Sequence, residues 1–476
     1  NHCTVFTIAE SSLDEKVIWV GTDDGNVQVT KDGGKTWTNT TANIKGLPAN
    51  TWCYHIEASS FDKGTAYAVF DGHTRNDKAT YCYKTTDYGQ TWTSIVTPDI
   101  YGFARSFQED YVNKDLLFLG TEFGLYVTLN GGKNWVKFEN NMPATAVHYL
   151  EMHKKTNDLI MGTHGRGIII IDDISPLRQL TDEVVAEPLH FMKTKPYVMS
   201  EESTFGGTSS EVQFVGANPY DGAKIIYYLS KRHTFGKMSM KVYDMNGKFI
   251  ITLNAGKKKG INIVPWNFTR LVPVVAKGKT ISQGGFLAPR VPAGTYKIVV
   301  EKGKDTYETT IDVEYDKKAT FTLAERKQQQ EVTDKLYNMT EELAYMVYEL
   351  DTWMEHAEAI AKDNAGLKKT ADALKAEMQS LKETLVITTG DNYVGAAEKE
   401  LREKMGDLYS TIGQYYGAPS ETQLENLARI EGEMQTARER HVAIKGKTLA
   451  KYQAALTKAQ LTAPEIKAYE EFVKKD

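Results

Sequence analysis

Polar residues that can do chemistry follow the apolar runs in the first third of this sequence. They are carboxylates, imidazoles and guanidinium groups, and several stand directly after a Gly-Thr pair or in an insertion behind an apolar run. The set comprises Asp23, Asp24, Asp71, His73, Arg75, Glu122, His164 and Arg166. Brought to one surface, these groups would form a polar ligand site. Tight turns also favour such residue types, so a structural role for each one stays open.

Three of these carboxylates, at Asp24, Asp71 and Glu122, are the candidate catalytic groups. Most glycoside hydrolases use two carboxylates about 5–10 Å apart, a separation that sequence does not reveal. The motifs His-Glu-x-x-His, Cys-x-x-Cys and Gly-x-Ser-x-Gly do not occur, nor does a glycine-rich phosphate loop. We therefore expect neither a metal site nor a cofactor.

An eight-residue segment recurs three times and indicates the elements that position these groups. It occupies residues 30–37, 85–92 and 128–135, with the common form Ser/Thr-x-Asp/Asn-x-Gly-x-Thr/Asn-Trp, the Asp box. The Asp or Asn side chain accepts hydrogen bonds from nearby backbone N–H groups, and Gly supplies the positive φ of a tight turn. The pattern therefore predicts three equivalent hairpin turns with a packed tryptophan.

Apolar strands recur around these turns with a period close to that of a propeller blade. Upstream strands align on Ile8, Ile56, Phe107 and Leu150, which are 48, 51 and 43 residues apart. About four short strands per unit at this spacing are typical of β-propeller blades. A β-sandwich with coincidental turns is the alternative, and three turns in register argue against it.

Four blades are visible within residues 1–176, and propellers typically need about 4–8. We expect an incomplete ring, whose partners are upstream propeller blades from the same precursor or from another chain. A closed four-blade ring is the less favoured alternative.

Four stretches that follow the apolar strands carry a family resemblance. Residues 18–25, 70–73, 120–126 and 162–167 resemble large bacterial Asp-box proteins, also described as bacterial neuraminidase repeat, glycosyl hydrolase-like or sortilin-like β-propellers. The resemblance implies a protein of Bacteroidota that is secreted, periplasmic or at the cell surface, with this chain as its C-terminal portion. The glycosyl hydrolase label rests largely on the Asp box, which is a folding motif.

Two further domains are expected after the blades. Residues 177–318 contain short apolar strands with turn signals such as Asn246-Gly247, which predict an immunoglobulin-like or fibronectin-like β-sandwich. Residues 319–476 carry apolar side chains at steps of three and four, which predict a helical bundle or hairpin. A capping box at 420–423 and a turn at 363–366 are expected there. The predicted fold class is thus mainly β with an α-helical C-terminal domain.

Composition narrows the function classes. The formal net charge is −5 and no long basic run occurs, which argues against nucleic acid as a partner. No apolar stretch is long enough to span a bilayer. Cys53 and Cys82 either pair with each other or are small buried apolar residues, and Cys3 is left over.

No specific catalytic constellation emerges, so we expect a binding or scaffold module for protein, peptide or glycan rather than an enzyme. The alternative is an extracellular glycoside hydrolase that uses carboxylates on the propeller face. A third hypothesis is that the chain is one half of a proteolytically nicked protein.

Overall fold

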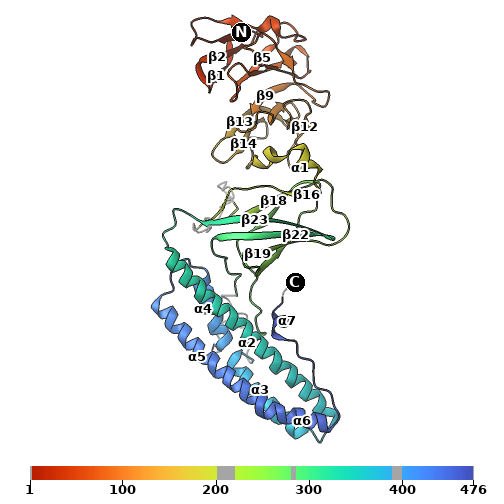
Figure 1. The fold of residues 1–476 in the computed structure, drawn as a ribbon, viewed down its shortest axis with the longest axis vertical. Helices are drawn as coiled ribbons and strands as arrows, with labels where there is room; N and C mark the ends of the chain where they lie inside the picture. The colour runs from red at the N-terminus through yellow and green to blue at the C-terminus, as the bar shows by residue number, and fades with distance from the viewer. Residues whose placement is uncertain (1–2, 201–219, 280–285, 389–398, 475–476) are drawn as a thin grey trace. The chain divides into compact units, whose positions relative to one another are not determined.

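The computed structural model describes residues 3–200, 220–279, 286–388 and 399–474. The chain divides into two compact units, residues 1–193 with 227–231, and residues 194–226 with 232–476 (Figure 1). Strands fill the first unit, and the second combines strands with a C-terminal helical region. The predicted fold class is therefore confirmed. The domain boundaries at 176 and 318 remain predictions.

Four antiparallel sheets, named blades 1 to 4, make up most of the first unit. Their strands follow chain order from one edge to the other. Blade 1 contains β1 (Val5–Ser11), β2 (Asp14–Thr22), β3 (Val27–Thr30) and β4 (Thr38–Asn39), and blade 2 contains β5 (Trp52–Ala58), β6 (Ala66–Asp71), β7 (Tyr81–Thr85) and β8 (Thr93–Ser94). Blade 3 contains β9 (Ala104–Glu109), β10 (Leu117–Thr121), β11 (Gly124–Thr128) and β12 (Val136–Lys137), and blade 4 contains β13 (Ala146–His153), β14 (Asp158–His164) and β15 (Ile168–Ile171).

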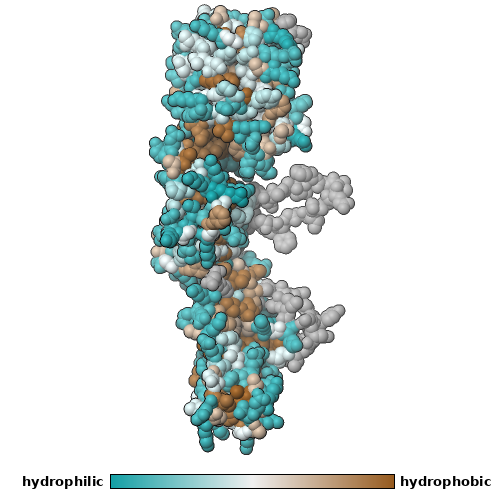
Figure 2. Space-filling view, turned by 90° about the vertical axis from the view of Figure 1, so that its right-hand side faces the viewer, coloured by the Kyte–Doolittle hydropathy of each residue, from teal (hydrophilic) through white to brown (hydrophobic). Residues whose placement is uncertain are grey.

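The blades pack face to face, with their first strands as neighbours. Strand β1 lies against β5, β5 against β9, and β9 against β13. A separate apolar cluster fills each of the three interfaces. Apolar side chains also gather at the surface of the blades (Figure 2). Blades 2 and 3 therefore bury side chains on both faces, and blades 1 and 4 bury side chains on the face toward their neighbour.

The repeated turns follow the predicted chemistry. Asp32 accepts hydrogen bonds from the backbone N–H of Lys35 and Thr36 at 3.0 Å each, and from the Thr36 hydroxyl at 2.6 Å. Asp87 makes the equivalent bonds to Thr91. The Thr36 bonds hold the pKa of the Asp32 carboxyl well below its ordinary value. The glycine at the fifth turn position has a positive φ in all three turns, from 79° to 92°.

The two cysteines of blade 2 are free and buried. Cys53 belongs to the apolar cluster between blades 1 and 2, and Cys82 to the cluster between blades 2 and 3. The sheet separates the two thiols, so the alternative of small buried apolar residues holds, and the suggested pairing is wrong. Burial raises the pKa of both thiols.

The first unit continues through η3 (Ser175–Gln179) and α1 (Asp182–Ala186) to β16 (Leu189–Phe191), which pairs with the end of β18 (Ala223–Leu229). Strand β18 also neighbours β21 (Gly260–Trp266). A second sheet has the order β17 (Tyr197–Met199), β23 (Asp305–Tyr315), β22 (Gly294–Lys302), β19 (Met238–Asp244) and β20 (Phe249–Leu253). The predicted hairpin joins β19 to β20, with φ of 82° at Gly247. The Gly-, Ser- and Thr-rich stretch 200–210 predicts a loop, and beyond Ser200 it lies outside the described residues.

The helical region consists of α2 (Leu323–Asp363), α3 (Lys368–Leu385), α4 (Leu401–Gly413), α5 (Glu421–Ile444), α6 (Ala450–Lys458) and α7 (Tyr469–Val473). A π-helical segment, Lys445–Leu449, joins α5 to α6. The apolar stripes of α2 and α3 lie in one buried cluster. Ser420 and Gln423 form the predicted capping box of α5, and the predicted turn separates α2 from α3. No helix among the described residues is long and apolar enough to cross a membrane.

Candidate functional site

The first strands of the four blades share an irregularity at one position. Each contains a β-bulge, a point where one extra residue interrupts the pairing with the second strand. The extra residues are Phe6, Tyr54, Arg105 and His148. Each lies two residues before the aligned apolar residue of its blade, so they are equivalent by repeat. We refer to these four residues as the bulge row.

Neighbours in the bulge row touch one another in order. The ring centroids of Phe6 and Tyr54 are 5.2 Å apart, and the Arg105 guanidinium lies 4.9 Å from the Tyr54 ring. Arg105 Nη1 is 2.8 Å from His148 Nε2. Bulges redirect side chains and are common beside binding and active sites. Here they place four different side chains in one row across four blades.

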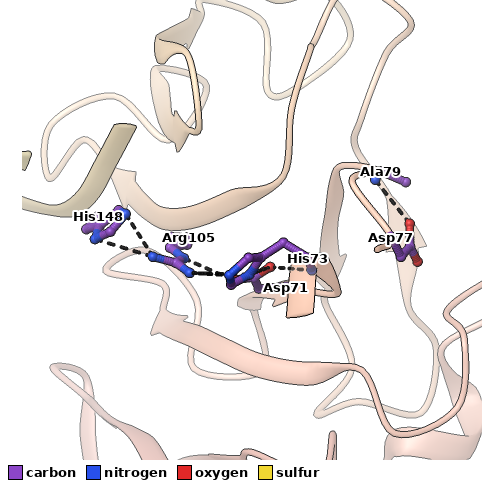
Figure 3. Close-up of polar contacts among 6 residues, drawn as sticks. All are labelled: Asp71, His73, Asp77, Ala79, Arg105 and His148. Atoms are coloured by element: carbon purple, nitrogen blue, oxygen red, sulfur yellow. Dashed lines mark hydrogen bonds and ion pairs between the residues drawn. The ribbon is translucent and has the colours of Figure 1, made fainter. Parts of the chain in front are cut away.

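A single buried carboxylate compensates the charge of Arg105. Asp71 ends β6 and its side chain is fully buried, with Oδ2 at 2.9 Å from Arg105 Nε. The same carboxylate accepts from the His73 backbone N–H at 2.9 Å and lies 2.7 Å from His73 Nδ1. The network runs from His73 through Asp71 and Arg105 to His148 and joins blades 2, 3 and 4 (Figure 3).

Aromatic and imidazole rings surround this network. The Phe103 ring lies 5.1 Å from the Arg105 guanidinium and stacks on His73 at 4.7 Å. His148 stacks on His164 at 5.1 Å. Burial, then Arg105 and His164, lower the pKa of His148, so at neutral pH its ring is uncharged and accepts a hydrogen bond from Arg105.

The aromatic end of the bulge row continues to Trp52, whose ring is 4.6 Å from that of Phe6 and 4.9 Å from that of Tyr54.

The structure brings three of the predicted site residues together. Asp71 and His73 belong to the network, and His164 joins it through His148. Sequence reasoning did not select Arg105 and His148 as site residues. The signal that identifies them is their repeat position, two residues before Phe107 and Leu150.

Three other predicted site residues make contacts outside this network. Asp23 accepts from the Thr4 backbone N–H at 2.8 Å. Asp24 accepts from the Thr22 hydroxyl, and this bond holds the pKa of Asp24 below its ordinary value. Arg75 donates to the Ala49 carbonyl and to the Thr51 hydroxyl, each at 3.0 Å.

Two predicted residues remain, at the turns of blades 3 and 4. One carboxylate oxygen of Glu122 is buried without a hydrogen-bond partner, and Arg166 is exposed. Asp77 bonds the Ala79 backbone N–H at 3.1 Å and lies apart from the network (Figure 3). In the described part of the chain, no contact joins Asp24 or Glu122 to Asp71. No group of acidic, histidine or cysteine side chains there has the arrangement of a metal site.

Comparison with family models and with curated proteins gives no match. Among solved structures, the chain is similar to the GH74 enzyme of Niastella koreensis, with 20% identity over 35% of this chain and 22% of that chain and a TM-score of 0.25. It is similar to YCF48 bound to D1 peptide, with 18% identity over 36% and 50% of the two chains and a TM-score of 0.28.

A third similar structure is the GH74 xyloglucanase of Xanthomonas campestris, with 15% identity over 39% of this chain and 31% of that chain and a TM-score of 0.32. The chain thus spans half or less of the length of these three proteins.

Proposed function

We propose that this chain is the blade-bearing part of an exported, sortilin-like Asp-box protein that acts as a binding module for protein, peptide or glycan. The observation that carries the proposal is the bulge row. Four repeat-equivalent positions on four neighbouring strands present two aromatic rings, a guanidinium group and a neutral imidazole side by side. Aromatic and arginine side chains are the types that dominate recognition surfaces.

The exposed rim of this site supports recognition rather than hydrolysis. Phe6 of the bulge row and Tyr149, which follows His148 in the chain, are each about half exposed, while the Asp71 side chain is fully buried. A rigid polar anchor with accessible aromatic side chains around it is the usual composition of a binding site. Export by a bacterium of the Bacteroidota, to the periplasm, the cell surface or the medium, is proposed from the resemblance of the repeated turns.

The alternative, glycoside hydrolysis, needs two accessible carboxylates, one of which holds a proton. Asp71 is a buried counterion of Arg105, and the bond from Thr22 keeps Asp24 ionised. Glu122, whose buried oxygen lacks a partner, is the one remaining candidate among the three. The alternative therefore depends on a single carboxylate that lies outside the network.

Binding of the intact chain to peptide and glycan arrays tests the proposal. We expect Tyr54→Ala to weaken binding of the selected ligands at least tenfold, because the Arg105 guanidinium loses the ring on which it lies. The control is Phe235→Ala, an exposed aromatic residue of the second unit, and it should leave binding unchanged. Hydrolysis of a polysaccharide that disappears in Glu122→Gln would refute the binding assignment and establish the alternative.

A further inference from the structure

Two aromatic rings stack on each other at one end of blade 3. Tyr101, in the loop before β9, is 71% exposed. Its ring stacks on that of Phe123, in the turn between β10 and β11, with centroids 5.2 Å apart and an interplanar angle of 27°. An accessible pair of stacked rings offers an apolar platform to a ligand.

The loop that carries Tyr101 is anchored on both sides of this residue. Ile100 is 7% exposed. The Tyr101 backbone N–H donates to the Tyr126 hydroxyl at 3.2 Å, and the Gly102 carbonyl accepts from the Thr80 hydroxyl at 2.5 Å. The backbone that presents the exposed ring is therefore held in place, which reduces the entropy that binding would cost.

A carboxylate without a partner adjoins the two rings. Glu122 directly precedes Phe123, and a Cβ atom at Gly102 would lie 3.1 Å from the Cβ atom of Glu122. In the described part of the chain, Oε2 of Glu122 is buried and accepts no hydrogen bond, and the side chain forms no ion pair. Removing a carboxylate from water without a donor or a cation is unfavourable.

The other carboxylates predicted for this site differ from Glu122 in this respect. Asp71 pairs with Arg105, Asp23 accepts from a backbone N–H, and Asp24 accepts from a hydroxyl. Each of the three is therefore compensated inside the protein. Glu122 is the carboxylate of the set that is left for a ligand.

Phe103 connects this group of residues to the bulge row. Its carbonyl accepts from the Glu122 backbone N–H at 2.9 Å, and its ring lies 5.1 Å from the Arg105 guanidinium. The charge of Arg105 is already compensated by Asp71. A cation that compensates Glu122 would then come from a molecule bound beside the bulge row.

We infer that Tyr101, Phe123 and Glu122 form a subsite, the rim subsite, for a positively charged side chain of a partner peptide. The faces of the two rings attract an arginine or lysine side chain, and the carboxylate compensates its charge. A neutral glycan would supply hydroxyl donors but no charge, so the observations favour a basic peptide. The inference rests on the proposed binding function and narrows its ligand to this class.

Peptide selection on the intact chain tests the inference. Random decapeptides displayed on phage are selected for binding, and we expect the bound peptides to share an arginine or a lysine at one position. In the synthetic peptide, citrulline then replaces that arginine, or acetyl-lysine that lysine, which removes the charge and keeps a similar shape. We expect the affinity to fall about tenfold, because the ion pair with Glu122 and the contact with the rings are weakened.

Two variants of the protein locate the effect. Glu122→Gln should weaken the basic peptide about tenfold and should leave the affinity of the uncharged peptide unchanged, since the two changes remove the same interaction. Tyr101→Ala should weaken the basic peptide as well. The matched control is Glu139→Gln, which removes an exposed carboxylate after β12 and should change neither affinity. It makes the same change to the net charge of −5, so it separates a local contact from general attraction.

Selected peptides without a shared basic residue would overturn the inference, as would selection of no peptide or binding of neutral glycans alone. Equal affinity of the basic peptide for the parent and Glu122→Gln would do the same. Because the Glu122 side chain has no hydrogen bond or ion pair in the described residues, that variant should fold as the parent does. Binding that Tyr54→Ala weakens and Glu122→Gln does not would keep the bulge row and remove the rim subsite. The reverse result would keep the rim subsite and remove the bulge row.

Discussion

A mostly buried guanidinium group needs a compensating charge, and among the described residues Arg105 forms an ion pair with one carboxylate, that of Asp71. His73 and His148 complete its polar contacts but add no negative charge. The pair therefore fixes the orientation of Arg105 in the bulge row. Removing one partner of a buried pair leaves the other charge without compensation, which is costly.

Asp71→Asn tests how strongly this pair holds the blades. We expect the variant to lose about 3 kcal/mol of unfolding free energy, since Arg105 would stay buried without its counterion. Urea unfolding followed by tryptophan fluorescence measures the loss. The matched control is Asp14→Asn, which removes the exposed ion pair with Lys63 and should cost less than about 1 kcal/mol. Equal losses in the two variants would contradict the buried pair.

His148 provides a pH-dependent probe of the same network. Because burial and Arg105 lower its pKa in the folded state, the unfolded chain binds its proton at a higher pH, near the ordinary value of 6.5. The contribution of His148 to stability is therefore full above pH 6.5 and is lost as the pH falls below it. Histidine NMR titration should show His148 titrating below 6.5 in the folded chain and near 6.5 in urea. A folded-state value at or above 6.5 would show that the ring does not accept from Arg105.

The elements illustrate which features a sequence reveals. The repeated turns were predictable because one Asp accepts the backbone hydrogen bonds of the hairpin and one Gly adopts its positive φ, all within the turn. The helices were predictable because the apolar residues from Leu336 to Ala357 lie on one face. The bulges were not predictable, because the amino-acid composition of a strand does not reveal an extra residue in it. In strands whose side chains alternated strictly between the two faces, Arg105 and His148 would point in other directions. Their contact therefore depends on two bulges that are 43 residues apart in the sequence.

A matched pair of glycines tests the seating of one blade on the next. Gly89 and Gly34 occupy the same turn position with φ of 79° and 89°, but only Gly89 abuts Thr40 of a neighbouring blade. Gly34→Ala should cost about 1–2 kcal/mol from the positive φ alone. Gly89→Ala should cost a further 1–3 kcal/mol, roughly, from the clash with Thr40. Chemical denaturation of both variants measures the difference in unfolding free energy. Identical losses would argue against close packing of the Gly89 turn on Thr40.

At the scale of the whole molecule, the chain consists of two compact units with separate cores. The three clusters between blades belong to the first unit, and the helical cluster belongs to the second. The sequence predicted both kinds of element from local periodicity. It did not identify which side chains meet across blades, because those contacts depend on the packing of whole sheets.

This separation predicts that damage to the helical core leaves the candidate site intact. Leu350 on α2 is fully buried, and Leu350→Ala should lower the stability of the helical region by about 2–5 kcal/mol. Circular dichroism at 222 nm follows that transition, while the NMR signals of His73 and His148 report the network. These signals should not shift, because no side chain of the network belongs to the helical cluster.

The control is Val442→Ala on the exposed face of α5, which should change neither readout. Shifted histidine signals in Leu350→Ala would show that the two units share one cooperative core, and the site would then depend on the helices as well as on the blades.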